Sequence, residues 1–141
     1  MNYSTDNTRI IDKVDLVTPN DVISKYPLKD EISKLVYGTR NEVSQILHGK
    51  DDRLIAVVGP CSIHDPNSAE EYAKLLIDEK QKYEEDILLI MRVYFEKPRT
   101  SIGWKGLIND PDMDNTFDAN KGLFLARSIP VSYTHLRAHE T

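Results

Sequence analysis

The sequence is short of three features: it has one cysteine, no long apolar run and no excess of positive charge. The single cysteine, Cys61, excludes an intramolecular disulfide. The longest apolar runs, residues 54–58 and 87–91, fall far below the roughly 20 residues that a bilayer span requires. With 18 Lys and Arg against 23 Asp and Glu, the net charge of −5 gives no overall positive field. We therefore expect neither nucleic acid nor a membrane as a partner.

The composition is that of an ordinary globular protein. The 141 residues are 40% hydrophobic and 29% charged, which is too apolar for a disordered chain. The first four residues lack the basic and then apolar pattern of a signal peptide, so we expect a cytoplasmic location. Composition alone favours no fold class.

The first half of the chain predicts a polar arm, a helix and a strand. Residues 1–28 are polar, with short apolar clusters that form no core of their own. Apolar residues recur at helical spacing over residues 30–48, which predicts an amphipathic helix that is weakened at Gly38 and ends at Gly49. Residues 54–58 are continuously apolar and are followed by Gly59 and Pro60, which is typical of a strand buried in a parallel sheet.

The second half repeats the strand and helix pattern. Ser68 and Glu71 can form a capping box at the start of a helix, residues 87–95 predict a second buried strand, and a long loop follows to residue 115. Another helix begins near residues 119–126. This order predicts a parallel α/β fold. Two strands complete no standard parallel sheet, so we expect a truncated domain.

Basic residues gather after the second strand, although the chain is acidic overall. Between residues 91 and 108, Arg92, Lys97, Arg99 and Lys105 face a single acid, Glu96. Arg92 interrupts an apolar strand, and a guanidinium near a core requires an acid or phosphate partner. The loop lies at the carboxyl end of the strand, where α/β proteins bind ligands. Two interpretations stay open with equal weight: a phosphate clamp, or a buried Arg–Glu pair beside a solvated basic loop.

Cys61 follows the first strand and should share this edge of the sheet. A thiolate there can bind a divalent metal or act as a nucleophile, but a lone cysteine is more often a small buried apolar residue. His64 is either a metal-site residue or, more commonly, a loop histidine that caps the next helix. Asp110, Asp112 and Asp114 alternate as in a calcium loop. That motif is rejected because its glycine and glutamate positions hold Asn115 and Lys121.

Three stretches together resemble a known family. Residues 59–66 (GPCSIHDP), 91–100 (MRVYFEKPRT) and 103–111 (GWKGLINDP) resemble the type I 3-deoxy-D-arabino-heptulosonate 7-phosphate (DAHP) synthases. The resemblance implies a (β/α)8 TIM barrel after an N-terminal extension, of which this chain would hold the first third. Residues 1–50 would then be the extension and its helix, and residues 51–129 the first two βα units of the catalytic barrel.

The resemblance also implies a reaction: condensation of phosphoenolpyruvate with erythrose 4-phosphate to give DAHP and phosphate, the first step of the shikimate pathway to aromatic amino acids. Such an enzyme is a transferase that needs a divalent metal, with Mn, Fe, Co or Zn all plausible. The residues implied are Cys61 as a metal ligand, Arg92 and Lys97 on phosphoenolpyruvate, and Pro98, Arg99, Thr100 and Lys105 on the erythrose 4-phosphate side. The other three metal ligands of the family have no counterpart here, so we expect the chain alone to be inactive.

The N-terminal extension implies regulation and assembly. In the family it contributes to homo-oligomer contacts and to a feedback site for an aromatic amino acid. Residues 1–3 together with Asp6 and Arg9 look closest to the phenylalanine-sensitive branch, with Asp6 as a residue of the effector site.

The last twelve residues depart from the resemblance. Pro130 should break the final helix near its third turn, and residues 131–141 have neither helical nor strand periodicity. They resemble a peptide encoded by a translated sequencing adapter, so we expect residues 130–141 to be a non-native tail.

Two other functions stay open: another phosphoenolpyruvate-dependent sugar-phosphate synthase, and a non-catalytic anion-binding or regulatory module.

Overall fold

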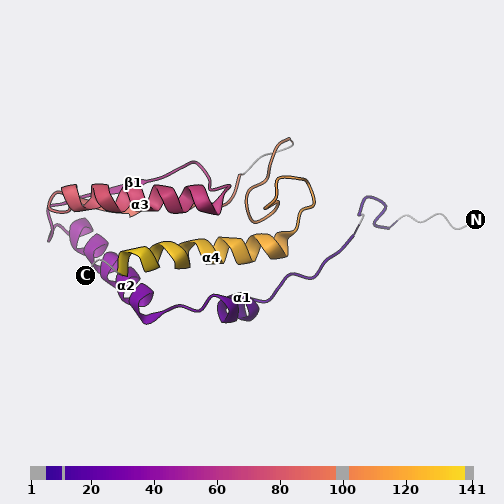
Figure 1. Ribbon diagram of the computed structural model, residues 1–141, viewed down its shortest axis with the longest axis horizontal. Helices are drawn as coiled ribbons and strands as arrows, with labels where there is room; N and C mark the ends of the chain where they lie inside the picture. Colours follow the sequence, from indigo (N-terminus) through magenta and orange to yellow (C-terminus); the bar gives the residue numbers. More distant parts are fainter. Residues whose placement is uncertain (1–5, 11, 98–101, 139–141) are drawn as a thin grey trace, which may run out of the picture.

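The computed structural model describes residues 6–10, 12–97 and 102–138, with only the backbone described from residue 133 onward. Within these residues, four helices and two strands follow one another in the order α1 (Pro19–Lys25), α2 (Asp30–Leu47), β1 (Leu54–Val58), α3 (Pro66–Tyr83), β2 (Ile87–Met91) and α4 (Ala119–Ala138) (Figure 1). The expected helix over residues 30–48 is confirmed, and it continues through Gly38 without interruption.

The two strands form a parallel pair, as the βα order predicts. Leu54 pairs with Ile87 and Val58 with Met91, and α3 makes the connection between the strands. A parallel pair needs such a crossover because its strands start at the same edge of the sheet. Both strands therefore deliver their carboxyl ends to one edge.

The second strand is shorter than residues 87–95, so that prediction was wrong at its end. Pairing stops at Met91 because the neighbouring strand ends at Gly59 and Pro60, and a proline has no N–H to continue the ladder. The amide of Arg92 makes the last bond, to the carbonyl of Val58 at 2.6 Å. Further on, the amide of Ile63 donates to the carbonyl of Tyr94 at 2.8 Å, which keeps the two loops together.

The start of α3 also differs from the expectation. Asp65 is its N-cap: its carboxylate accepts hydrogen bonds from the backbone amides of Asn67 and Ser68 at 3.2 and 2.9 Å. The predicted capping box of Ser68 and Glu71 is therefore wrong, and so is the idea that His64 caps the helix. An aspartate such as Asp65 is a favoured N-cap because its carboxylate accepts from the first free amides of the helix. Pro66 suits the first helical position because its nitrogen carries no hydrogen that needs an acceptor.

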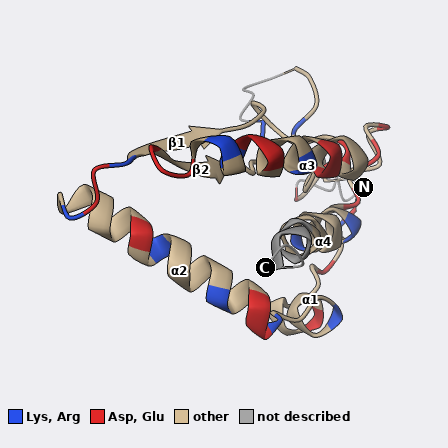
Figure 2. Cartoon of the chain, turned by 60° about the vertical axis from the view of Figure 1, so that its left-hand side comes forward, with Lys and Arg blue, Asp and Glu red and all other residues tan. Residues whose placement is uncertain are grey.

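The core lies where α4 packs across α3. Ala69 and Ala73 stand four residues apart on α3, where they form one face, and their small side chains let the helices approach closely. Ile63, Leu107 and Ile129 complete the buried cluster. Figure 2 shows the strands and α3 on one side, with α2 and α4 on the other. α4 packs against both α3 and α2, so it ties the two sides together.

Helix α4 does not stop at Pro130, which corrects the expectation that the proline breaks it. A proline inside a helix costs about 3 kcal/mol because one hydrogen bond is lost and its ring crowds the preceding turn. Ile129, only 2% exposed, packs in the core next to this proline, and its burial offsets part of that cost. The origin of residues 130–141 stays a prediction.

The N-terminal segment lies along α4 through polar contacts. The side chain of Asn120 accepts a hydrogen bond from the amide of Val17 at 2.8 Å and donates one to the carbonyl of Asp15 at 3.0 Å. Arg127 donates to the carbonyl of Tyr26 at 3.2 Å. No residue of α1 is buried, in agreement with an arm that forms no core of its own. No helix in the described part of the chain is both long and apolar enough to span a bilayer.

The cap of α3 gives a stability prediction. The hydroxyl of Ser68, followed by the amides of Ser68 and Asn67, holds the pKa of Asp65 below its ordinary value of 3.8. The stability that Asp65 contributes is thus present above pH 3.8 and is lost as the pH falls through the lowered pKa. Asp65→Ala should lower the urea midpoint at pH 6, with a smaller effect at pH 3, whereas Glu71→Ala should change it little at either pH. An equal loss in both variants would contradict the observed cap.

Candidate phosphate and metal site

The candidate site lies at the carboxyl edge of the sheet, where Gly59 and Arg92 follow the two strands. A Cβ atom at Gly59 would stand 2.5 Å from the carbonyl oxygen of Arg92, so only glycine permits this approach. The close approach places Cys61 and Arg92, which are 31 residues apart in sequence, side by side. The sequence prediction that both share one edge is confirmed.

The guanidinium of Arg92 is held by main-chain carbonyls. Its Nη1 donates to the carbonyl oxygens of Pro60 and Cys61 at 2.6 and 2.7 Å, and its central carbon lies 4.7 Å from the centre of the Tyr94 ring. Two carbonyl acceptors and a ring face fix the orientation of this cation without neutralising it.

The described residues provide no carboxylate for Arg92, so the alternative of a buried Arg–Glu pair is not what the structure shows. Glu96 instead accepts a hydrogen bond from the side-chain amide of Asn109 at 2.7 Å. Among the residues that the structure describes, the Nε and Nη2 hydrogens of Arg92 have no hydrogen-bond partner. They form a planar pair of donors with the geometry that a phosphate or carboxylate accepts.

Cys61 is exposed and its thiol is free. The prediction that a lone cysteine is buried packing is therefore wrong for this residue. His64 is exposed on the same loop, while the carboxylate of Asp65 is occupied as the cap of α3. Over the described ranges, no three His, Cys, Asp or Glu side chains come together as a metal cluster. The chemistry of Cys61 fits one ligand of a thiolate-containing site, but these residues do not complete one.

A short antiparallel contact organises the basic loop. Glu96 pairs with Gly106, and the amides of Lys97 and Leu107 donate to the carbonyls of Lys105 and Phe95 at 3.0 and 2.8 Å. This pairing brings Lys97 and Lys105 together, and both are half-buried. The sequence placed both lysines on one loop without predicting the pairing. Pro98, Arg99 and Thr100 lie outside the described residues.

A hydrogen bond between Trp104 and Asp110, neither of which the sequence analysis selected as functional, closes the end of this loop. The indole N–H of Trp104 donates to the carbonyl oxygen of Asp110 at 2.6 Å, and Asp110 is only 2% exposed. Leu107, which lies between them in sequence, is fully buried. A tryptophan in a polar loop was the available signal, because its N–H needs an acceptor when the ring is buried. Asp6, the predicted effector residue, is exposed in the N-terminal segment.

Known proteins match this chain over most of its length. Residues 25–136 match the model of the DAHP synthetase I family. The chain belongs to that family. The resemblance seen in the three sequence stretches is thereby confirmed. A phospho-2-dehydro-3-deoxyheptonate aldolase of Haemophilus influenzae is 52% identical over 127 residues, which cover 89% of this chain and 35% of that protein.

Two further relatives give the same picture. The Phe-sensitive phospho-2-dehydro-3-deoxyheptonate aldolase of Escherichia coli K12 is 47% identical, over 92% of this chain and 37% of that protein. A solved structure of the aldolase from Francisella tularensis SCHU S4 has a TM-score of 0.86 and 50% identity, and covers 90% of this chain and 37% of its own. The chain thus spans just over a third of the length of these family members.

Gly106 tests whether the antiparallel contact holds the two lysines together. It has φ +115°, and a Cβ atom there would overlap the carbonyl oxygen of Phe95. Gly106→Ala should therefore separate the two segments and speed hydrogen exchange of the Lys97 and Leu107 amides. Gly38→Ala is the control, because nothing lies within 4 Å of its Cβ position and alanine should stabilise a helix by roughly 0.5–1 kcal/mol. Unchanged protection of both amides in Gly106→Ala would count against the contact.

Proposed function

We propose that this chain carries the first part of the active site of a DAHP synthase, which condenses phosphoenolpyruvate with erythrose 4-phosphate to give DAHP and phosphate. The observation that carries the proposal is the fixed, unneutralised guanidinium of Arg92 beside the exposed thiol of Cys61. A reaction between two phosphorylated substrates needs several cations at one edge of the sheet. We infer the reaction itself from the family to which the chain belongs.

The proposed architecture is a truncated (β/α)8 barrel. Residues 1–50 form the N-terminal extension with its helix, and residues 51–129 form the first two βα units of the catalytic barrel. The parallel pairing of β1 with β2 and the packing of α3 and α4 against each other support it. Such barrels use about 250 residues and bind substrates at the carboxyl ends of their strands, which is where Cys61 and Arg92 lie.

We assign the phosphoenolpyruvate contacts to Arg92 and Lys97. The Nε and Nη2 groups of Arg92, which no described residue occupies, can bind one anionic group of this substrate in a planar, bidentate manner. The ammonium of Lys97 can supply a second positive charge. Lys105, held next to Lys97 by the loop pairing, joins the erythrose 4-phosphate side. We assign Pro98, Arg99 and Thr100 to that side as well, from the family resemblance alone.

The reaction forms one carbon–carbon bond and one carbon–oxygen bond to water, and it breaks the carbon–oxygen bond to phosphate. One proton of the water goes to the aldehyde oxygen, and the other leaves with the phosphate. The methylene carbon of phosphoenolpyruvate attacks the aldehyde carbon, water adds to the neighbouring enol carbon, and phosphate leaves from that carbon. A divalent metal held through Cys61 would polarise the aldehyde. The residues of this chain contribute by positioning the substrate: the cations of Arg92 and Lys97 orient the phosphoenolpyruvate and balance its charge. The chain alone should be inactive, because no three His, Cys, Asp or Glu side chains gather into a metal site among its described residues.

Arg92→Ala in a full-length form of the protein tests this assignment. Loss of a positioned charged donor should lower phosphoenolpyruvate turnover by on the order of 100- to 1000-fold, while the bound metal, measured by elemental analysis, stays the same. Lys74→Ala is the control, since it removes one positive charge from an exposed ion pair on α3. Turnover that survives in Arg92→Ala would refute the role of Arg92.

We also propose feedback inhibition by an aromatic amino acid through the N-terminal extension, with phenylalanine as the effector and Asp6 in its site. The Phe-sensitive E. coli relative and the N-terminal sequence support this choice. Phenylalanine should inhibit the full-length protein more strongly than tyrosine or tryptophan do, and Asp6→Ala should weaken that inhibition. Stronger inhibition by either of the other two amino acids would overturn the proposal.

A further inference from the structure

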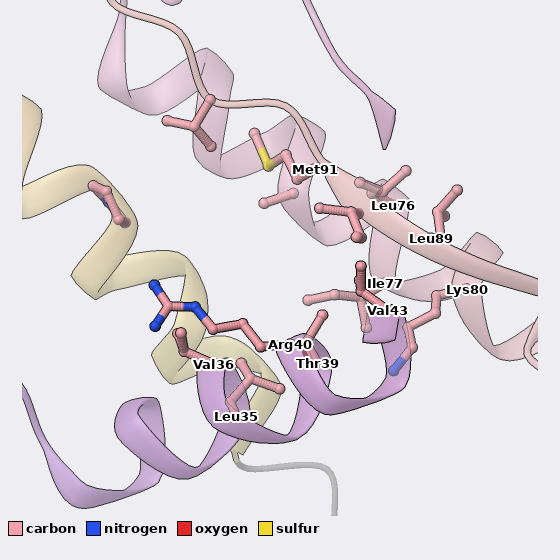
Figure 3. Close-up of a pocket in the computed structure, with 14 residues that line it drawn as sticks. Leu35, Val36, Thr39, Arg40, Val43, Leu76, Ile77, Lys80, Leu89 and Met91 are labelled. Atoms are coloured by element: carbon pink, nitrogen blue, oxygen red, sulfur yellow. The ribbon is translucent and has the colours of Figure 1, made fainter. Parts of the chain in front are cut away.

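The segment that leaves the carboxyl end of β2 has two sides of different character. Met91 and Val93 line an apolar hollow between β2, α2 and α3 (Figure 3). Both residues, together with Phe95, also pack against the buried core cluster. Side chains two residues apart in an extended segment share one side. Arg92 and Tyr94, which do not line the hollow, therefore lie together on the other side.

The backbone that carries Tyr94 is fixed by two hydrogen bonds from the core. The carbonyl of Tyr94 accepts from the amide of Ile63 at 2.8 Å, and the carbonyl of Phe95 accepts from the amide of Leu107 at 2.8 Å. Ile63 and Leu107 both belong to the buried cluster. The ring of Tyr94 is 38% exposed, so it meets solvent while its backbone cannot shift.

The hydrogen bonds of Arg92 hold its guanidinium at one corner. Both bonds come from Nη1, which donates to the carbonyl oxygens of Pro60 and Cys61. Bonds that meet at one nitrogen restrain that corner, but they leave the plane of the group able to tilt. The ring of Tyr94 lies against the face of the group, with 4.7 Å between the ring centre and the central carbon of the guanidinium. The ring thus limits a motion that the two carbonyls do not limit.

A neutral ring suits this position better than an acid does. A carboxylate beside Arg92 would form a bidentate pair with it and would occupy the donors that an anionic ligand needs. An aromatic ring attracts a cation through its face and leaves the N–H groups at the edge of the guanidinium available. Glu96, the acid closest to Arg92 in sequence, bonds to the side chain of Asn109 instead.

We propose that Tyr94 is a positioning residue for phosphoenolpyruvate. Its ring holds the guanidinium of Arg92 at the angle at which the Nε and Nη2 donors meet an anionic group of the substrate. The inference rests on the proposed function, because it takes Arg92 as a ligand of phosphoenolpyruvate. Without the ring, the guanidinium must be ordered as the anion binds, and that cost weakens binding. The hydroxyl of Tyr94 has no part in this role.

The first test compares Tyr94→Leu with Tyr94→Phe in a full-length form of the protein. Tyr94→Leu should raise the KM for phosphoenolpyruvate by about three- to tenfold, with kcat and the KM for erythrose 4-phosphate changed by less than about twofold. Tyr94→Phe keeps the ring face, so all three constants should stay within about twofold of the unsubstituted protein. Tyr83→Leu is the matched control, because Tyr83 is a half-exposed ring at the end of α3, near the start of β2.

A double-mutant cycle shows whether Tyr94 acts through Arg92. Tyr94→Leu alone should lower kcat/KM for phosphoenolpyruvate by about three- to tenfold. Combined with Arg92→Ala, it should lower kcat/KM by less than about twofold beyond Arg92→Ala, because no guanidinium is left to orient. A ring that only stabilised the fold would cost the same in both backgrounds.

The possible failures have different signatures. The positioning role is wrong if Tyr94→Leu leaves the KM for phosphoenolpyruvate unchanged, if Tyr94→Phe has the same effect as Tyr94→Leu, or if the loss is equal with and without Arg92. In each of these cases a loss of turnover in Arg92→Ala still supports the proposed function. Turnover that survives in Arg92→Ala would contradict the proposed function and the role of Tyr94 together.

Discussion

The parallel pairing of β1 with β2 is the constraint on which the candidate site depends. Five residue pairs in register, from Leu54 with Ile87 to Val58 with Met91, fix the point at which each strand leaves the sheet. The residues that follow must then meet at one edge, and Gly59 is the one residue small enough for the backbone of Arg92 to come so close. Cys61 and Arg92 are neighbours because of hydrogen bonds made by apolar strands that carry no reactive group.

The backbone at this edge is fixed, but some buried side-chain atoms in the loops that follow the strands lack hydrogen-bond partners among the described residues. Within the residues that the structure describes, two buried side-chain atoms lack hydrogen-bond partners, the Oγ of Ser62 and one carboxylate oxygen of Asp110. Ser62 lies in the loop that follows β1, and Asp110 lies in the loop that follows β2. Buried polar atoms are costly without partners. Unpartnered buried atoms in both loops agree with a chain that spans just over a third of the length of its relatives.

The sequence predicts what short-range patterns control. Both strands and the helices α2, α3 and α4 follow from apolar runs and helical spacing, and the shared edge of Cys61 and Arg92 follows from parallel order. The misses have tertiary causes. The cap of α3 depends on whether the side-chain oxygen of Asp65 or that of Ser68 reaches the first amides. The backbone pairing of Lys97 with Lys105 depends on the close approach of Gly106 across the loop. The continuation of α4 through Pro130 depends on the burial of Ile129.

Arg92 and the lysines attract an anion strongly only where water is excluded. A pair of unit charges about 4 Å apart is worth roughly 1 kcal/mol in bulk water and several times that near a protein surface of lower effective dielectric constant. In this chain Cys61 is exposed and Lys97 is half-buried, so water reaches both groups. Water at this edge therefore weakens the attraction between these cations and any anion that they bind.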